Sequence, residues 1–314
     1  MRYVLGVDGG GTKTSVALAT VDSNQDQQTP LAIGLAGPSN VRTVGLDHAI
    51  AELNLAISAA FQNADMERQT VDSICLALAG SDDVTTKQAL QDWVRNQQIA
   101  KAVVVTNDAQ AVMAAAFQDQ PGMVVISGTG SLVLGQDGAG KFWRAGGWGP
   151  LFGDQGSGYW IALHLFRSLA EMLDQSQDPG VLGSLVANAA NRRDLRSFLR
   201  SVASELDRPA IAEFAKIVIH MAEQGDSICQ TIADSAGQAL ANQAACVASR
   251  FSSGTAIPFA VAGSVLLNSA RIQHAMILEL ERQSVAVQTL KLVADVHIGT
   301  IYLASRELHS ASSD

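Results

Sequence analysis

The chain carries one short pattern twice: an apolar segment, a glycine-rich turn and a second apolar segment. In the first copy, residues 3–7 are apolar, residues 8–11 read Asp-Gly-Gly-Gly, and residues 14–20 alternate in the manner of a β-strand. The second copy spans residues 123–134 around the turn Ser-Gly-Thr-Gly-Ser, so that Ser127 takes the place of Asp8. An internal duplication is the economical explanation, and chance similarity between two short hairpins is the alternative. Two related lobes are therefore expected.

The rest of the sequence alternates between strand and helix patterns. After a polar loop at 22–29, strands are predicted at 31–35, 73–78 and 102–106, and helices at 46–62, 84–98 and 108–117. After the second hairpin come a helical region at about 157–252, strands at 257–262 and 285–290, and helices ending near 282 and 308. This predicts an α/β layer fold with an N-terminal lobe at 1–118 and a C-terminal lobe at 119–314 that contains the helical insertion. The last helix is expected to fold back on the first lobe, and a cleft is expected between the lobes because 314 residues exceed one domain of ~150.

The charge balance excludes several classes of partner. The 21 Lys and Arg face 30 Asp and Glu, a formal net charge of -9, so no field is present to hold a nucleic acid or an anionic membrane. The three cysteines, Cys75, Cys229 and Cys246, have no metal or disulfide spacing. No apolar run approaches the ~18 residues of a membrane span, and the N-terminal apolar stretch is too short for a signal peptide. A cytoplasmic protein without nucleic-acid or membrane partners is expected.

The first glycine turn has the chemistry of a phosphate loop. It is not a Walker loop, because Thr12 separates Gly11 from Lys13, and it lacks the last glycine of the dinucleotide fingerprint. Glycine N–H groups can nevertheless turn toward a phosphate, Thr12 adds a hydroxyl, and Asp8 at a strand end is placed to hold Mg²⁺ through water. The second turn, at 128–131, offers the same groups, and two such loops could clamp one polyphosphate. The alternative is a pair of tight β-hairpins without a ligand.

Two further segments carry candidate residues. Asp108 follows a buried-type strand, where α/β folds place their chemistry, but an Asp in that position also serves as a helix N-cap. Residues 146–160 are rich in glycine, with Trp148 offering a flat apolar face to a sugar ring and Asp154 able to accept hydrogen bonds from hydroxyl groups. The alternative is a purely structural loop, with Trp148 in the core and Asp154 capping the helix that follows.

Together these segments resemble the N-acetylglucosamine kinase family. The resemblance rests on seven motifs in order, at 8–14, 37–40, 107–109, 128–131, 146–149, 153–159 and 262–265. This family falls in the BadF/BadG/BcrA/BcrD-type ATPase group, with the ATPase activators of acyl-CoA dehydratases and reductases. The resemblance implies two ribonuclease H-like lobes of the actin-like ATPase and sugar kinase superfamily, an ATP-dependent kinase with Mg²⁺, and a homodimer.

The resemblance also assigns roles to single residues. The nucleotide-binding residues that it implies are Gly10, Gly11, Thr12, Lys13, Gly128, Thr129, Gly130, Gly263 and Ser264. The amino-sugar contacts that it implies are Asn40, Asn107, Trp148, Gly149 and Asp154. Asp108 corresponds to the catalytic base, which removes a proton from the acceptor hydroxyl.

Three positions depart from the family pattern. Gln155 replaces the glutamate usual after the Gly-Asp of the sugar loop, which leaves the preferred sugar open. The turn at 262–265 reads Ala-Gly-Ser-Val where two glycines are common, and residues 297–300 read His-Ile-Gly-Thr where a Pro-rich Gly-Ala turn is usual. Both changes are expected to act on nucleotide affinity.

The favoured function is phosphorylation of N-acetylglucosamine at its 6-hydroxyl. Glucosamine is the alternative acceptor within the same class. An ATPase activator would need cysteines for a shared iron–sulfur cluster, and Cys75, Cys229 and Cys246 do not offer that arrangement. A non-catalytic sugar sensor is the remaining alternative, and the presence of Asp8, Thr12 and Asp108 argues against it.

Overall fold

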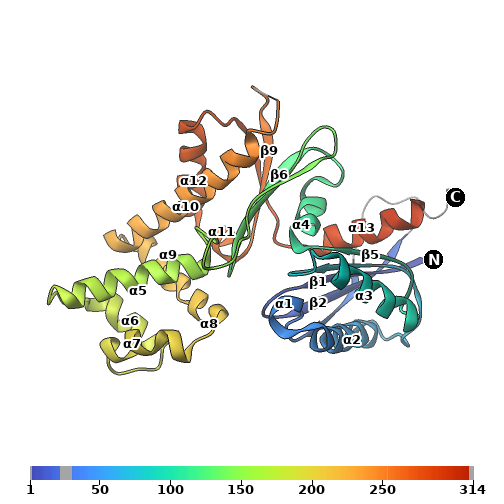
Figure 1. Ribbon diagram of the computed structural model, residues 1–314, viewed down its shortest axis with the longest axis horizontal. Helices are drawn as coiled ribbons and strands as arrows, with labels where there is room; N and C mark the ends of the chain where they lie inside the picture. The colour runs from blue at the N-terminus through green and yellow to red at the C-terminus, as the bar shows by residue number, and fades with distance from the viewer. Residues whose placement is uncertain (1, 22–29, 253, 311–314) are drawn as a thin grey trace. The chain divides into compact units, whose positions relative to one another are not determined.

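The protein was analysed as a computed structural model that describes residues 2–21, 30–252 and 254–310 (Figure 1). The polar loop predicted at 22–29 lies outside the described residues. The chain divides into two compact units, Met1–Gln120 together with Asp295–Asp314, and Pro121–Ala294. Among the described helices, none combines the length and hydropathy that a membrane-spanning segment requires.

A mixed five-stranded sheet forms the centre of the first unit, in the order β3-β2-β1-β4-β5. Strand β1 pairs antiparallel with β2 and parallel with β4, and β4 pairs parallel with β5. The strands are β1 (Arg2–Gly9), β2 (Thr14–Val21), β3 (Pro30–Ala36), β4 (Val71–Leu78) and β5 (Ala100–Thr106). Because β1, β4 and β5 are parallel, their carboxyl ends share one edge of the sheet, where Asp8 and the loops after β4 and β5 lie.

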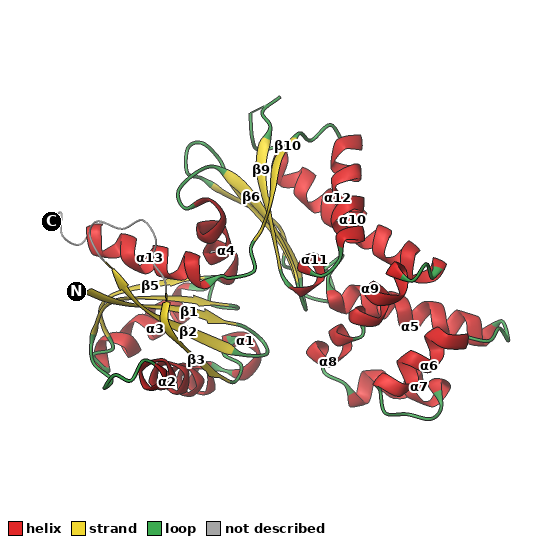
Figure 2. Ribbon diagram, turned by 180° about the vertical axis from the view of Figure 1, so that it is seen from behind, coloured by secondary structure: helices red, strands yellow, loops and turns green. Residues whose placement is uncertain are grey.

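Helices cover both faces of this sheet, as Figures 1 and 2 show. The helices are α1 (Val41–Val44), α2 (Leu46–Asn63), α3 (Val84–Asn96), α4 (Asp108–Phe117) and α13 (His297–Ser310). Helices α2 and α3 pack on one face, and α4 and α13 on the other. Helix α13, the last of the chain, thus packs on the sheet formed by the first residues of the chain. Side chains such as Leu5 and Ile74 are fully buried on one face, and Val4 and Cys75 on the other.

The second unit repeats the strand arrangement of the first. Its sheet has the order β10-β9-β6-β7-β8, with β6 antiparallel to β7, β7 antiparallel to β8, and β6 and β10 both parallel to β9. The strands are β6 (Gly122–Ser127), β7 (Ser131–Gln136), β8 (Phe142–Gly146), β9 (Ile257–Ala262) and β10 (Val287–Leu292). Strand for strand, this is the topology of the first sheet. The repeated topology favours duplication over chance similarity as the origin of the repeated hairpin.

The helical region of the second unit packs around one long helix. Its helices are α5 (Gly158–Asp174), α6 (Gly180–Ala189), α7 (Leu195–Glu205), α8 (Arg208–Glu213), α9 (Ala215–Glu223), α10 (Ser227–Ala248), α11 (Ser264–Leu267) and α12 (Ala270–Arg282). Helix α10 packs against β7, β8, α5, α9 and α12. Its buried face includes four alanines and a glycine, and Gly237 lets the α12 backbone approach, because a Cβ there would lie 2.6 Å from the oxygen of Ile272. Small residues thus allow close packing of these helices.

Candidate active site

The first predicted phosphate loop joins β1 to β2, and backbone hydrogen bonds hold it on one side. The Gly10 N–H donates to the Lys13 oxygen at 3.0 Å, and the Gly10 oxygen accepts from the N–H groups of Ser39 and Asn40, each at 3.1 Å. A Cβ on Gly11 would have no heavy atom within 4 Å, and Thr12 and Lys13 are exposed. The loop is therefore fixed on one side and open on the other, as an anion site built from backbone amides requires.

Two carboxylates meet near this loop. Asp8 lies near the end of β1, and Asp108 is the first residue of α4, directly after the parallel strand β5. Burial raises the pKa of Asp8 to about 6, with a further contribution from Asp108 and a smaller one from Asp295, while Lys13 opposes the shift. A buried carboxylate with a second carboxylate near it is stabilised by a cation.

Magnesium fits this part of the site. Mg²⁺ usually keeps several waters and binds through one or two carboxylates together with substrate phosphates. Among the described residues, no group of three or more His, Cys, Asp or Glu side chains could hold a metal ion alone. Asp8 could therefore contribute to a magnesium site only in combination with water and phosphate oxygens.

The N-cap of α4 is Asn107, so the interpretation of Asp108 as the cap is wrong. The Asn107 Oδ1 accepts from the Gln110 N–H at 2.9 Å, and its Nδ2 donates to Asp82 at 2.9 Å. The Asp108 Oδ1 accepts from the Ala109 N–H at 3.0 Å at the start of the same helix. Capping is thus carried out by the neighbour, because Asn107 has the extended backbone that a cap needs.

The loop after β4 was not predicted to belong to the site. It supplies Asp82, which holds Asn107, and Gly80, where a Cβ would lie 2.6 Å from the Asn40 Oδ1. Asn40 itself caps α1 by accepting from the Arg42 N–H at 3.1 Å. The two asparagines predicted to contact sugar thus flank one loop in the first unit. Only the parallel order of β1, β4 and β5 reveals that the two asparagines flank this loop, and no local sequence motif predicts it.

The second phosphate loop, between β6 and β7, is fastened to the segment before α5. The Gly128 N–H donates to the Gly130 oxygen at 3.0 Å, and the Gly128 oxygen accepts from the Gly158 N–H at 2.7 Å. The hydroxyls of Ser127 and Ser131 donate to the oxygens of Gly156 and Gln155, both at 2.8 Å. The loop therefore lies at the N-terminus of the 17-residue helix α5, where the helix dipole favours an anion.

Gly263 and Ser264 pack against this loop. Gly263 has a φ of 89°, and a Cβ there would lie 2.3 Å from the Ser127 oxygen, so both its conformation and its space require glycine. Ser264 begins the short helix α11, and its oxygen accepts from the Asn268 Nδ2 at 2.7 Å. The structure thus brings together Gly128, Thr129, Gly130, Gly263 and Ser264, all predicted to bind nucleotide.

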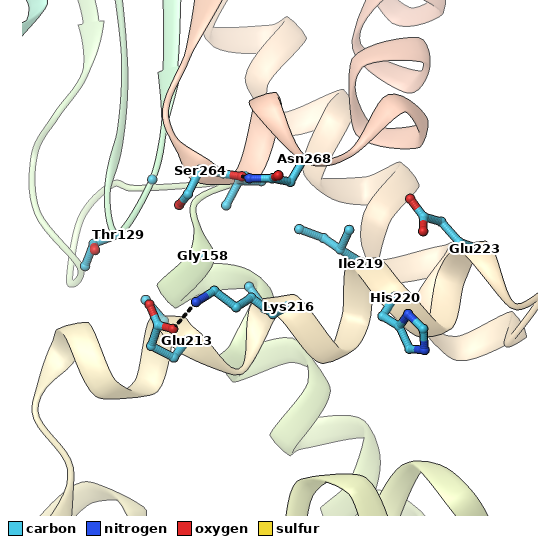
Figure 3. Close-up of a pocket in the computed structure, with 13 residues that line it drawn as sticks. Thr129, Gly158, Glu213, Lys216, Ile219, His220, Glu223, Ser264 and Asn268 are labelled. Atoms are coloured by element: carbon cyan, nitrogen blue, oxygen red, sulfur yellow. Dashed lines mark hydrogen bonds and ion pairs between the residues drawn. The ribbon is translucent and has the colours of Figure 1, made fainter. Parts of the chain in front are cut away.

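Gly128, Thr129 and Ser264 border a pocket of about 310 Å³, within the ~300–1,000 Å³ common for small-ligand sites (Figure 3). Its lining comes from the second phosphate loop, α8, α9, α11 and the first residue of α5. Thr129, Ser264 and Asn268 lie on one side, and Lys216 and Ile219 on the other. The Lys216 ammonium is paired with Glu213, and Glu223 adds a second carboxylate to the lining. The sequence did not predict the contribution of α8 and α9.

Asp154 and Trp148 have opposite environments. Asp154 is 3% exposed, accepts from the Ser131 N–H at 3.2 Å and forms an ion pair with Arg208. The cap of α5 is Ser157, whose Oγ accepts from the Trp160 N–H at 3.2 Å, so the capping interpretation of Asp154 is wrong. Trp148 is 71% exposed, so its alternative placement in the core is also wrong. Beside it, Gly149 has a φ of 81°.

The departures from the family pattern have structural counterparts. The exposed Gln155 contributes its backbone oxygen, which accepts from Ser131 and from the Gln243 Nε2 at 3.0 Å. Residues 297–300 begin α13 in the first unit, where the His297 Nε2 lies 2.7 Å from the Ser15 Oγ and burial lowers the pKa of His297. These contacts give residues 297–300 a packing role in the first unit, whereas the nucleotide turn at Gly263 belongs to the second.

Each unit holds part of the predicted site. Asp8, Asn40, Asn107, Asp108 and the loop 10–13 belong to the first unit. The loop 128–130, the turn at 263–264 and the residues Trp148, Gly149 and Asp154 belong to the second.

The chain is similar in sequence to known proteins. The family model described as BadF/BadG/BcrA/BcrD ATPase matches residues 5–299. The N-acetyl-D-glucosamine kinase of Dictyostelium discoideum is 32% identical over 249 residues, which cover 75% of this chain and 76% of that protein. The N-acetylmuramic acid/N-acetylglucosamine kinase of Clostridium acetobutylicum is 27% identical over 241 residues, covering 76% and 77%.

A solved structure shows the same fold. The crystal structure of a protein from Chromobacterium violaceum, assigned to the N-acetylglucosamine kinases, has a TM-score of 0.76 at 23% identity and covers 96% of this chain and 99% of that chain. This likeness confirms the predicted α/β fold.

Proposed function

The chain belongs to the BadF/BadG/BcrA/BcrD ATPase family, and we propose that it is an ATP-dependent amino-sugar kinase that phosphorylates N-acetylglucosamine at its 6-hydroxyl. The observation that carries the proposal is the pocket of about 310 Å³ that opens beside the second phosphate loop. We infer that the pocket holds the nucleoside of ATP, whose phosphates would then meet the backbone amides of the loop. The names of the relatives from Dictyostelium and Clostridium support an amino sugar as the acceptor.

The residues of the first unit supply the chemistry at the acceptor. We propose that Asp108 takes the proton of the acceptor hydroxyl as that oxygen attacks the γ-phosphoryl group of ATP, with ADP as the leaving group. Asn107, held by Asp82, and Asn40 would orient the sugar. The loop 10–13 would contribute amides, the Thr12 hydroxyl and the Lys13 ammonium to the phosphates.

Asp8 is suited to a magnesium-bound nucleotide. Bound Mg²⁺ would neutralise charge on the phosphates, and Asp8 would hold it through water. Asp8 stands next to Asp108, so a cation there also offsets the repulsion that raises the pKa of Asp8. Trp148, Gly149 and Asp154 are also proposed as sugar contacts. We also propose that the protein is a homodimer, for which light scattering would report the mass of two chains. We propose that it acts in the cytoplasm.

The test is coupled ADP release with Mg²⁺–ATP and a panel of acceptors. We expect turnover with N-acetylglucosamine and little without sugar; the panel also contains glucosamine, N-acetylmuramic acid, N-acetylmannosamine and glucose. Identification of the product by NMR would locate the phosphate. Turnover with glucosamine alone would identify glucosamine as the acceptor. Sugar-independent ATP hydrolysis, or no ATP hydrolysis at all, would contradict the kinase proposal in favour of an activator or a sensor.

A further inference from the structure

Arg208 places a cation directly against the second phosphate loop. It is the first residue of α8, the helix whose last residues line the pocket. A Cβ on Gly130 would lie 2.5 Å from the Arg208 Nη2, so the guanidinium occupies the space that the missing side chain leaves. The Arg208 Cζ also lies 6.0 Å from the centre of the Tyr159 ring. The guanidinium is thus within reach of any anion bound at the loop amides.

Asp154 is the present partner of that cation. One carboxylate oxygen of Asp154 pairs with the Arg208 Nη2, and the other accepts from the Ser131 N–H. The Arg208 Nε is buried and has no hydrogen-bond partner among the described residues. A buried guanidinium donor without an acceptor is unfavourable. The pair with Asp154 is therefore an incomplete arrangement for Arg208.

A nucleotide would change the balance at this position. Guanidinium binds phosphate with two parallel hydrogen bonds, and a polyphosphate carries more charge than one carboxylate. In the pocket itself, Lys216 is already paired with Glu213, and Glu223 adds negative charge. Both cations are paired, but the Arg208 Nη2 lies against Gly130, so Arg208 is better placed than Lys216 to neutralise phosphates there.

We propose that Arg208 is a nucleotide-phosphate ligand that exchanges its Asp154 partner for a phosphate oxygen when nucleotide binds. The inference rests on the proposed function, because it takes the loop 128–130 as the phosphate site and Asp154 as a sugar contact. Release from Arg208 frees one oxygen of Asp154 to accept hydrogen bonds from sugar hydroxyls. Nucleotide binding thereby prepares the sugar contact, and by thermodynamic linkage the sugar strengthens nucleotide binding by the same factor.

The experiment compares ligands with and without phosphates on the full chain. Binding of adenosine, Mg²⁺–ADP and the non-hydrolysable Mg²⁺–β,γ-imido-ATP is measured by calorimetry for the wild type, Arg208→Gln, Arg208→Lys and Asp154→Asn. We expect Arg208→Gln to weaken both nucleotides about 10- to 100-fold and to leave adenosine unchanged. Arg208→Lys should recover part of the loss, since it keeps the charge without the planar fork. Asp154→Asn should bind nucleotide at least as tightly as the wild type.

The second readout is the coupling between the two ligands. N-Acetylglucosamine affinity is measured by tryptophan fluorescence with and without Mg²⁺–β,γ-imido-ATP. We expect the nucleotide to tighten sugar binding in the wild type and not in Arg208→Gln. Arg192→Gln is the matched control, because Arg192 pairs with Glu205 on the surface of the same unit.

The outcomes separate this inference from the proposed function. If Arg208→Gln weakens adenosine as much as the nucleotides, or matches Arg192→Gln in every measurement, Arg208 is a structural residue and the inference is overturned. If the wild type binds no adenine nucleotide and phosphorylates no amino sugar, the proposed function itself fails. If Arg208 only positions Asp154, Arg208→Gln would alter N-acetylglucosamine affinity to the same extent with and without nucleotide, and the inference would be overturned.

Discussion

Neighbouring residues divide two tasks at the start of α4. Asn107 satisfies the helix N-terminus through its Oδ1 and binds Asp82 through its Nδ2, while Asp108 stands one position further on, next to Asp8. A carboxylate one residue inside the helix keeps the favourable end of the helix dipole without serving as the cap. Asn107 therefore stabilises the N-terminus of α4, and the helix start that it fixes positions Asp108.

Asp108→Ala should lower kcat by about 10²- to 10⁴-fold with little change in ATP affinity, because only the proton acceptor is removed. Asp108→Asn keeps the shape and an oxygen for the Ala109 N–H, so it should show the same loss with an unchanged melting temperature. Steady-state kinetics and nucleotide calorimetry check both variants, with Asp92→Asn on the exposed face of α3 as control. Near-normal turnover of Asp108→Asn would remove Asp108 from this role.

At the residue scale, the sequence predicts what is local. The glycines, Asp8 and Asp108 stand in short motifs whose chemistry can be deduced from neighbouring letters. Arg208 and Asp82 stand in no such motif: Arg208 is 54 residues from Asp154, and Asp82 is 25 residues from Asn107. Such partners are set by the packing of elements, and only the structure identifies them.

The strands and helices follow hydrophobic patterns closely, with instructive exceptions. Most predicted elements are present, since buried strands such as β4 contain continuous apolar runs, in β4 at residues 74–78. Strand β8 was not predicted, because its five residues are mostly half exposed and lie in a glycine-rich stretch. Pairing with β7 holds β8 in the sheet, although the composition of β8 does not predict a strand.

The crossing of α13 and α4 offers a test at this scale. Gly299 lies where a Cβ would come within 1.9 Å of the Ala111 oxygen and 2.6 Å of the Ala115 nitrogen. Alanine favours a helix by about 1 kcal/mol over glycine, yet these backbone atoms can yield only if the helices separate. Gly299→Ala should therefore destabilise the protein by a net ~1–3 kcal/mol, as overpacking does.

Urea unfolding measures this loss in the free energy of unfolding. Gly138→Ala is the control, since a Cβ there meets no atom within 4 Å. A stability of Gly299→Ala equal to or above that of the wild type would show that α13 and α4 are packed less closely than the structure has them.

The two units differ in how the chain builds them. The largest hydrophobic core draws only on residues of Pro121–Ala294, from Met123 to Leu290, whereas the first unit joins its strands to α13 from the end of the chain. The second unit is continuous in sequence and the first is not, although both repeat one sheet topology.

Residues 121–294 should therefore fold as an isolated chain and keep the nucleotide pocket. All of the pocket's lining belongs to this unit, so we expect a cooperative thermal transition and affinity for adenosine within roughly tenfold, or 1.4 kcal/mol, of the full chain. Phosphorylation should be absent, because Asp108 is missing. Residues 1–120 are the matched comparison: without α13 they expose the sheet face around Val4 and Cys75 and should aggregate. A non-cooperative transition of 121–294, or loss of adenosine binding, would show that the nucleoside pocket depends on the first unit, and the assignment of that pocket to the second unit alone would then be wrong.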